Sequence, residues 1–328
     1  MNDIRQRRVS VADGVELDVT EAGQPGDALV VLCHGFPECA YSWRHQMRPL
    51  AEAGFHVLAP DQRGYGPSSA PADVESYGAQ HLTADVVALI DDAGAADAVV
   101  VGHDWGAFVA WHMAQLHPDR VRAVVGVSVP FTAWPAPPTE LMRAMWGDRF
   151  FYILYFQEVG PAERELGADI RRTMHATLWA ASGEMYRGVP TEFLPAAGGT
   201  GFLDSMLHGV GPVPDDLPSW LTEDDLDTYV ERFTASGFFG PLSWYRNLDA
   251  NYELTHEIPV ATMSMPSFFI GGRNDMVIAG RPGYVEAMEE LLPNYRGTAL
   301  IDGAGHWTQQ EAVGEFNDAL LGFLRTLP

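Results

Sequence analysis

An aspartate lies at the position in this chain where a reactive side chain would be held between a strand and a helix. Asp104 is at the centre of the sequence GHDWG, residues 102–106, which follows the apolar run 98–101 and precedes a helical pattern of small residues over 107–116. This is the strand, sharp turn and helix of a nucleophile elbow, with aspartate where the common G-x-S-x-G form has serine. A carboxylate that attacks an sp3 carbon leaves an ester, whose acyl carbon water can then attack. Asp104 therefore indicates transfer of an alkyl group to the enzyme, followed by hydrolysis.

Hydrolysis of such an ester needs a base that activates water. In this kind of site the partners follow the order nucleophile, acid, histidine along the chain. His306 comes just after the last predicted strand, and Asp275 follows the apolar strand 267–270. The competing position for the acid, residues 128–135, contains no acidic side chain. We therefore predict that His306 is the base and that Asp275 orients its imidazole and stabilises the cationic form.

The hydrolytic step also passes through an oxyanion, which backbone N–H groups must stabilise. One predicted donor is Trp105, the residue after the nucleophile. The other comes from the loop that follows the strand ending at Cys33, where Phe36 is the candidate. The side chains of Phe36, Pro37 and Trp105 are then expected to line the substrate pocket.

The elements that must position these residues alternate between strands and helices. Strand patterns occupy 28–33, 55–60, 98–101, 121–129, 267–270 and 298–301, a hairpin is predicted over 8–22, and helices are predicted over 81–93 and 312–327. Such alternation favours a mainly parallel sheet covered on both faces. Prolines, aromatic residues and helical periodicity dominate from about 131 to 245. We therefore predict a core formed by 1–132 and 246–328, with a helical lid inserted over 133–245.

Composition excludes several classes of function. The chain has 328 residues, is 47% hydrophobic and carries a formal net charge of −24, which disfavours nucleic acid and anionic membranes as partners. No uninterrupted apolar stretch approaches the length of a membrane span, and residues 1–8 are not followed by an apolar signal segment. The two cysteines, Cys33 and Cys39, fit a reducing compartment, and we expect a cytoplasmic protein. No Cys and His cluster or dinucleotide-binding motif occurs, so neither a metal nor a cofactor is expected.

The chain resembles the epoxide hydrolases of the α/β-hydrolase fold over nearly its whole length. The resemblance is carried by five segments: HGFP at 34–37, the elbow at 102–106, YILYFQ at 152–157, GFFGPLSWYRN at 237–247 and GAGHWTQ at 303–309. It implies a bacterial-type enzyme without an additional N-terminal domain. It also implies a catalytic triad, a covalent ester intermediate, a role in detoxification and a cis peptide bond before Pro37.

The same resemblance implies that two tyrosines of the lid hold the epoxide oxygen, and it matches them to Tyr152 and Tyr245. A tyrosine hydroxyl donates a proton while staying neutral at pH 7, which assists an alkoxide leaving group. Tyr155 follows Tyr152 by three residues and could share its helical face, so spacing alone does not choose between them. Alignment on the following Phe156 and Gln157 favours Tyr152.

The predicted reaction converts a small-molecule epoxide and water into a vicinal diol, through an ester on Asp104. One alternative is a haloalkane or haloacid dehalogenase, which can use the same aspartate and histidine but releases halide. The other is a non-catalytic ligand-binding protein that retains the hydrolase fold, because fold alone does not fix function. The apolar lid is compatible with a homodimer, since such a surface serves either an interface or the mouth of a pocket.

Overall fold

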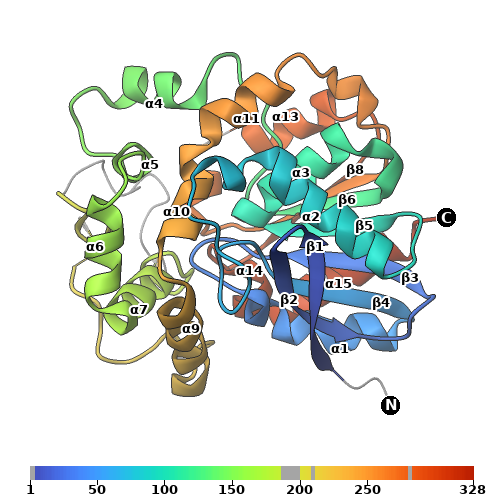
Figure 1. The fold of residues 1–328 in the computed structure, drawn as a ribbon, viewed down its shortest axis with the longest axis horizontal. Coiled ribbons are helices and arrows are strands. Elements are labelled where there is room, and N and C mark those ends of the chain that lie inside the picture. Colours follow the sequence, from blue (N-terminus) through green and yellow to red (C-terminus); the bar gives the residue numbers. More distant parts are fainter. Residues whose placement is uncertain (1–3, 186–199, 208–210, 280–282) are drawn as a thin grey trace.

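The structure, a computed structural model, describes residues 4–185, 200–207, 211–279 and 283–328, and its centre is a single sheet. The eight strands are ordered β1-β2-β4-β3-β5-β6-β7-β8 (Figure 1). Their bounds are β1 Arg5–Ala12, β2 Val15–Ala22, β3 Ala28–Cys33, β4 Phe55–Asp61, β5 Ala98–His103, β6 Val121–Val127, β7 Ser267–Gly272 and β8 Tyr295–Ile301. β2 is antiparallel to both β1 and β4, and all other neighbours are parallel. The predicted mainly parallel sheet and the N-terminal hairpin are confirmed.

Helices cover both faces of the sheet because its central strands are apolar on both faces. β3, β5 and β6 read ALVVLC, AVVVGH and VRAVVGV, and nearly all of these residues are buried. One set of their side chains packs with α2 (Ala79–Asp92) and α3 (Trp105–Leu116), and the alternate set with α1 (Arg44–Glu52) and α15 (Val313–Leu324). This two-sided burial is typical of parallel sheets, and it confirms the predicted α/β fold class.

The chain between β6 and β7 is helical wherever the structure describes regular elements, and in Figure 1 helices α4 to α9 lie to one side of the sheet. The helices are α4 Pro138–Trp146, α5 Tyr152–Tyr155, α6 Pro161–Ala168, α7 Ile170–Ala180, α8 Phe202–Leu207, α9 Glu223–Ser236, α10 Phe239–Arg246 and α11 Leu248–Thr255. A helical segment at this place agrees with the predicted insertion. The division of the chain into a core and a lid over 133–245 stays a prediction.

Short elements complete the chain. They are the 3-10 turns η1 Ala40–Trp43, η2 Glu75–Tyr77, η3 Pro118–Arg120 and η4 Val260–Thr262, and the helices α12 Met276–Ala279, α13 Tyr284–Leu291 and α14 Thr308–Glu311. The predicted strand 121–129 ends earlier, at Val127, because Ser128 has a φ of 65° and leaves extended geometry. Across the described residues, no helix is both long and apolar enough to span a membrane.

Candidate active site

Asp104 sits in a strained turn between β5 and α3. Its φ of 50° and ψ of −115° are rare for a residue with a side chain. Two glycines make this turn possible: a Cβ on Gly102 would lie 1.9 Å from the carbonyl oxygen of Gly106, and one on Gly106 would lie 2.0 Å from that of Cys33. The turn therefore brings the Asp104 carboxylate out over the carboxyl ends of β3 and β5, as the elbow motif predicts.

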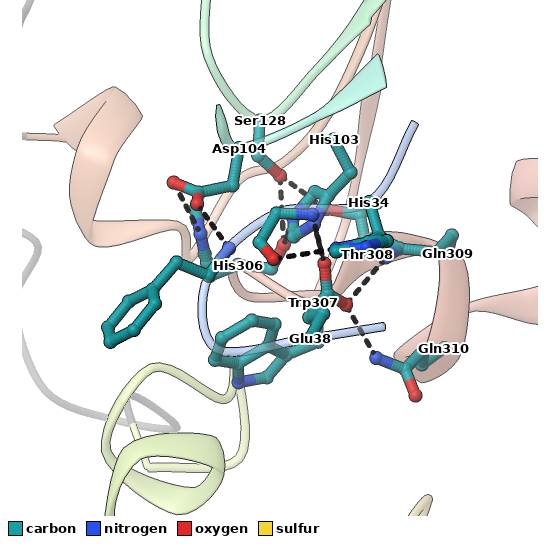
Figure 2. Close-up of polar contacts among 12 residues, drawn as sticks. His34, Glu38, His103, Asp104, Ser128, His306, Trp307, Thr308, Gln309 and Gln310 are labelled. Atoms are coloured by element: carbon teal, nitrogen blue, oxygen red, sulfur yellow. Dashed lines mark hydrogen bonds and ion pairs between the residues drawn. The ribbon is translucent and has the colours of Figure 1, made fainter. Parts of the chain in front are cut away.

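His306 lies between two carboxylates. Its Nε2 is 3.5 Å from Oδ2 of Asp104, and its Nδ1 is 3.1 Å from both carboxylate oxygens of Asp275 (Figure 2 shows Asp104 and His306). Asp275 is fully buried and also accepts the Val277 N–H at 2.8 Å, which holds its carboxylate in place. The structure thus brings together the three residues that the sequence analysis singled out from three distant segments.

The two carboxylates set the charge of the imidazole. Burial lowers the pKa of His306, but the negative charge of Asp275 and the contact with Asp104 outweigh it, so the pKa lies well above its ordinary value. The reverse holds for Asp104: burial raises its pKa, yet the hydrogen bond and positive charge of His306 bring it below the ordinary value. The free site therefore holds an anionic Asp104 beside a cationic His306.

The backbone near Asp104 supplies hydrogen-bond donors. The Phe36 N–H donates to Oδ1 of Asp104 at 2.9 Å. Trp105 is the first residue of α3, where backbone N–H groups have no partner within the helix. The Phe36–Pro37 peptide bond is cis, which confirms the bond expected from the resemblance. The Phe36 N–H therefore reaches the carboxylate, and Trp105, the other predicted donor, directly follows Asp104 in the chain.

Tyr245 lies over this site, on α10. Its ring packs edge-on against Phe36 and Trp105, with centroids 5.5 Å and 4.7 Å away. Tyr152, at the start of α5, packs against the Tyr245 ring at 6.1 Å. Burial, then the neighbouring Tyr152 and Asp104, raise the pKa of Tyr245 well above its ordinary value. Its hydroxyl therefore stays protonated over the working range of pH.

Tyr155 faces a different direction. It interacts with the Glu165 side chain on α6, and burial together with that hydrogen bond raises its pKa to about 12. Its ring contacts Phe150 and Phe156, whereas Tyr152 contacts Tyr245. Of the two tyrosines, the geometry therefore favours Tyr152 as the predicted partner of Tyr245.

The comparisons with known proteins agree with this arrangement. Residues 28–176 match the model of the alpha/beta hydrolase fold family. The chain is 48% identical to Epoxide hydrolase A of Mycobacterium tuberculosis over 98% of this chain and 97% of that protein. The crystal structure of Epoxide Hydrolase A from Mycobacterium thermoresistibile superposes with a TM-score of 0.90 at 48% identity, covering 99% of both chains. An epoxide hydrolase from an endophytic Streptomyces gives a TM-score of 0.85 at 35% identity, over 99% of this chain and 96% of that one.

The chain belongs to the epoxide hydrolase family. The aligned region covers 98% of the chain, so it includes both halves of the sheet and the helical segment between them. The family assignment and the enzyme class expected from the sequence are confirmed, and the reading as a non-catalytic binding protein loses its basis. In the described residues, no group of three or more His, Cys, Asp or Glu side chains is arranged to hold a metal ion.

This epoxide hydrolase also contains a buried polar network behind His306 that the sequence analysis missed (Figure 2). His103 Nδ1 lies 2.6 Å from Oε2 of Glu38, and its Nε2 lies 2.8 Å from the carbonyl oxygen of His306. Each ring nitrogen of His103 therefore has a hydrogen-bond partner within the buried network. The Ser128 hydroxyl donates to the same His306 carbonyl at 2.9 Å. The backbone of the predicted base is thus held by two donors.

Glu38 is the carboxylate that contacts Nδ1 of His103. Its carboxylate is fully buried and accepts from the Gly35 N–H and from the side-chain amides of Gln309 and Gln310, at 2.9 to 3.0 Å. Burial raises its pKa, but the charge and hydrogen bond of His103 bring it below the ordinary value. No local pattern in the sequence marks Glu38, because Gln309 and Gln310 lie 271 and 272 positions away.

Proposed function

We propose that this protein hydrolyses small-molecule epoxides to vicinal diols through a covalent ester on Asp104. The observation that supports this proposal is that a histidine–aspartate pair and a tyrosine both lie near the carboxylate of Asp104. His306 with Asp275 lies on one side of Asp104, and the Tyr245 ring packs on the two residues that border it, Phe36 and Trp105. The first pair suits hydrolysis of an ester, and a neutral tyrosine hydroxyl suits opening of an oxirane.

In the first step Oδ2 of Asp104 attacks an oxirane carbon, a C–O bond forms to that carbon and the oxirane C–O bond breaks. Tyr245 and Tyr152 hydrogen-bond the oxirane oxygen, and a tyrosine hydroxyl supplies the proton to the departing alkoxide. Oδ1 keeps its hydrogen bond from the Phe36 N–H and becomes the carbonyl oxygen of the ester. This assignment places the future oxyanion where a backbone donor already points.

In the second step water attacks the ester carbonyl carbon. Ester formation has removed the negative charge of Asp104, so the affinity of His306 for its proton falls. His306 therefore donates its proton to the tyrosinate, which restores the tyrosine hydroxyl. The neutral imidazole then accepts a proton from water, and Asp275 stabilises the resulting cation. The oxyanion on Oδ1 is stabilised by the N–H groups of Phe36 and Trp105. Collapse of the tetrahedral intermediate breaks the ester C–O bond, and the departing alkoxide takes the proton of the His306 imidazolium, so the diol leaves. The proton of the new Asp104 carboxylic acid then passes to His306, which restores the anionic Asp104.

The test is a single turnover of excess enzyme with styrene oxide, as a simple epoxide probe, in water enriched in heavy oxygen. The covalent route places the label in the Asp104 carboxylate and leaves the first-turnover diol unlabelled, as read by mass spectrometry of the peptide and the diol. Asp104→Ala is expected to abolish turnover, and His306→Gln to accumulate the ester. Label that enters the diol directly would refute the ester. Release of chloride from a haloalkane, without diol formation from epoxides, would favour the dehalogenase alternative.

The cytoplasmic location and the homodimer remain part of the proposal. Met145 on α4 and Val159 before α6 are apolar side chains that are 67% and 55% exposed, and we expect such side chains to contact a second copy. Light scattering during size-exclusion chromatography gives the mass directly. A mass of one chain, at the concentration used for assay, would refute the homodimer.

A further inference from the structure

One carboxylate joins the loop that carries His306 to the helical segment between β6 and β7. Glu311, the last residue of α14, accepts the N–H of Gly305 at 3.0 Å and of Trp307 at 3.1 Å, the residues on either side of His306. It also accepts the N–H of Gly183 at 2.8 Å and the hydroxyl of Ser182 at 3.3 Å, just after α7. Four donors from two distant segments therefore meet on Glu311.

The two segments lie backbone against backbone at this point. A Cβ on Gly305 would lie 2.1 Å from the Gly183 nitrogen, and one on Gly183 would lie 2.2 Å from the carbonyl oxygen of Gly303. The His306 N–H donates to the Ala181 carbonyl at 2.9 Å. The absence of a side chain at Gly305 and Gly183 thus permits the close approach that lets one carboxylate reach both segments.

Glu311 holds this position at a cost. Burial raises its pKa to about 7, against the opposing effect of the three backbone N–H groups, and the negative charge of Asp275 raises it further. Its hydrogen-bond donors, among the described residues, are backbone N–H groups and one hydroxyl, none of them cationic. A partly buried carboxylate without a cationic partner gains little stability from its charge. The geometry therefore favours a role in placing the loop.

We propose that Glu311 is a positioning residue for the water-activating step: its carboxylate fixes the loop of Gly305, His306 and Trp307 to residues 182–183, and so sets the imidazole relative to the ester on Asp104. This inference rests on the proposed function, because it assigns a separate hydrolytic step to His306. Glu311 itself does not touch Asp104 or the substrate. Its effect is transmitted through the backbone on both sides of the base.

The test compares Glu311→Gln with Glu315→Gln, a matched control on the exposed part of α15. A glutamine offers one acceptor oxygen, so its NH2 group would face either the Trp307 N–H or the three donors of Gly305, Gly183 and Ser182, and those donors would lose their partner. Rapid quenching and mass spectrometry of the styrene oxide ester give alkylation and hydrolysis separately. Glu311→Gln is expected to slow hydrolysis by about 10- to 100-fold, because a small misplacement of a base is costly, and to change alkylation by less than about threefold. Glu315→Gln is expected to match the parent protein in both steps.

A second measurement does not depend on turnover. In protein labelled with 15N-histidine, NMR follows the ring nitrogens of His306, which should shift in Glu311→Gln and not in Glu315→Gln. If the parent protein forms no ester, the proposed function fails while this spectrum still tests the positioning role. Unchanged His306 resonances, or an equal loss in both steps, would overturn the inference. If Glu311→Gln does not fold, Ser182→Ala replaces it, because this variant removes one of the four donors to Glu311. Unchanged hydrolysis and unchanged His306 resonances in Ser182→Ala would then overturn the inference.

Discussion

At the scale of single residues, Tyr245 and Tyr155 differ in what their hydroxyls can reach. Tyr245 packs against Phe36 and Trp105 above Asp104, whereas Tyr155 interacts with Glu165. We expect Tyr245→Phe to slow alkylation by about 100-fold or more, since it removes a general acid, and Tyr155→Phe to leave it nearly unchanged. Single-turnover kinetics of ester formation measures both. Equal losses in the two variants would contradict the assignment of the proton donor.

The charge of His306 gives a prediction about pH. Because Asp275 and Asp104 raise its pKa well above the ordinary value, removing one of these anions must lower it. Asp104→Asn, which has the same shape without the charge, is expected to lower the pKa of His306, as read by NMR titration. A neutral ester on Asp104 should act in the same direction. Hydrolysis should therefore rise with pH and level off at a lower pH than the His306 titration of the free protein.

If the His306 titration midpoint is the same in Asp104→Asn as in the parent protein, Asp275 alone sets the charge of the imidazole. His34 provides an internal control within the same spectra. It is fully buried, donates from one ring nitrogen and accepts the Gln62 N–H at the other, and burial lowers its pKa to about 4. Its resonances should stay those of a neutral ring throughout the titration.

At the scale of elements, the elbow depends on the absence of a side chain at Gly106. A Cβ there would lie 2.0 Å from the carbonyl oxygen of Cys33, and a backbone atom cannot move aside cheaply. Gly106→Ala is expected to lower the free energy of unfolding by about 3 kcal/mol. Gly167→Ala, in α6 with open space around the added carbon, should be neutral or stabilising by up to about 1 kcal/mol. Urea denaturation followed by circular dichroism compares the two.

A second element, α9, is attached to the sheet by a partly buried ion pair. Arg232 donates to Asp61 of β4 at 2.9 Å, and burial raises the pKa of Asp61 to about 6 even with this partner. Because the folded-state pKa lies above that of the unfolded chain, stability is lost as pH rises from about 4 to 6. Without the cation this pKa rises further. Arg232→Gln should therefore destabilise more at pH 8 than at pH 5, by about 3 kcal/mol at pH 8.

Arg171 supplies the control for that measurement. It pairs with Glu223 and Asp227 of α9, but its side chain is 46% exposed. Solvent screens such a pair, so Arg171→Gln is expected to cost less than about 1 kcal/mol, with little dependence on pH. Denaturant unfolding at both pH values decides the matter. Losses of similar size in the two variants would mean that Asp61 is not desolvated as its burial indicates.

The sequence allowed most elements of the sheet to be predicted, because apolar runs flanked by turn residues are local signals. β3 and β4 were placed almost to the residue, and β6 was extended too far because nothing local marks the positive φ of Ser128. Asp104, Asp275 and His306 were found from their places after strands, and the structure brings them together. Their catalytic roles stay predictions.

Other features depend on contacts between distant segments and could not be predicted in this way. Glu38 and Glu311 have no local pattern that marks them. The side chains of Gln309 and Gln310 that bind Glu38 lie 271 and 272 positions away, and the Gly183 N–H that binds Glu311 lies 128 positions away. Only the folded chain places these carboxylates around the His306 loop. Sequence reasoning is strongest where a single segment determines a residue's surroundings, and weakest where two segments meet.

At the scale of the whole molecule, the excess of acidic residues bears on which substrates approach the site. A net charge of −24 gives the protein a negative field that repels anions at low salt. An epoxide that carries a carboxylate should therefore react more slowly than its neutral amide at low salt, with the difference in kcat/KM rather than in kcat. Raising ionic strength from about 20 mM to about 200 mM shortens the screening length severalfold and should raise kcat/KM for the carboxylate.

The neutral amide substrate is the control that distinguishes the effect of the protein's negative field from other effects of salt on the enzyme. Its kcat/KM is expected to change by less than about twofold over the same range, because it carries no charge for the field to act on. Initial rates for both substrates at matched pH give the comparison. A carboxylate substrate whose kcat/KM falls as salt is added would show that a local cationic group near the entrance outweighs the net charge. The overall field would then not govern which epoxides reach Asp104.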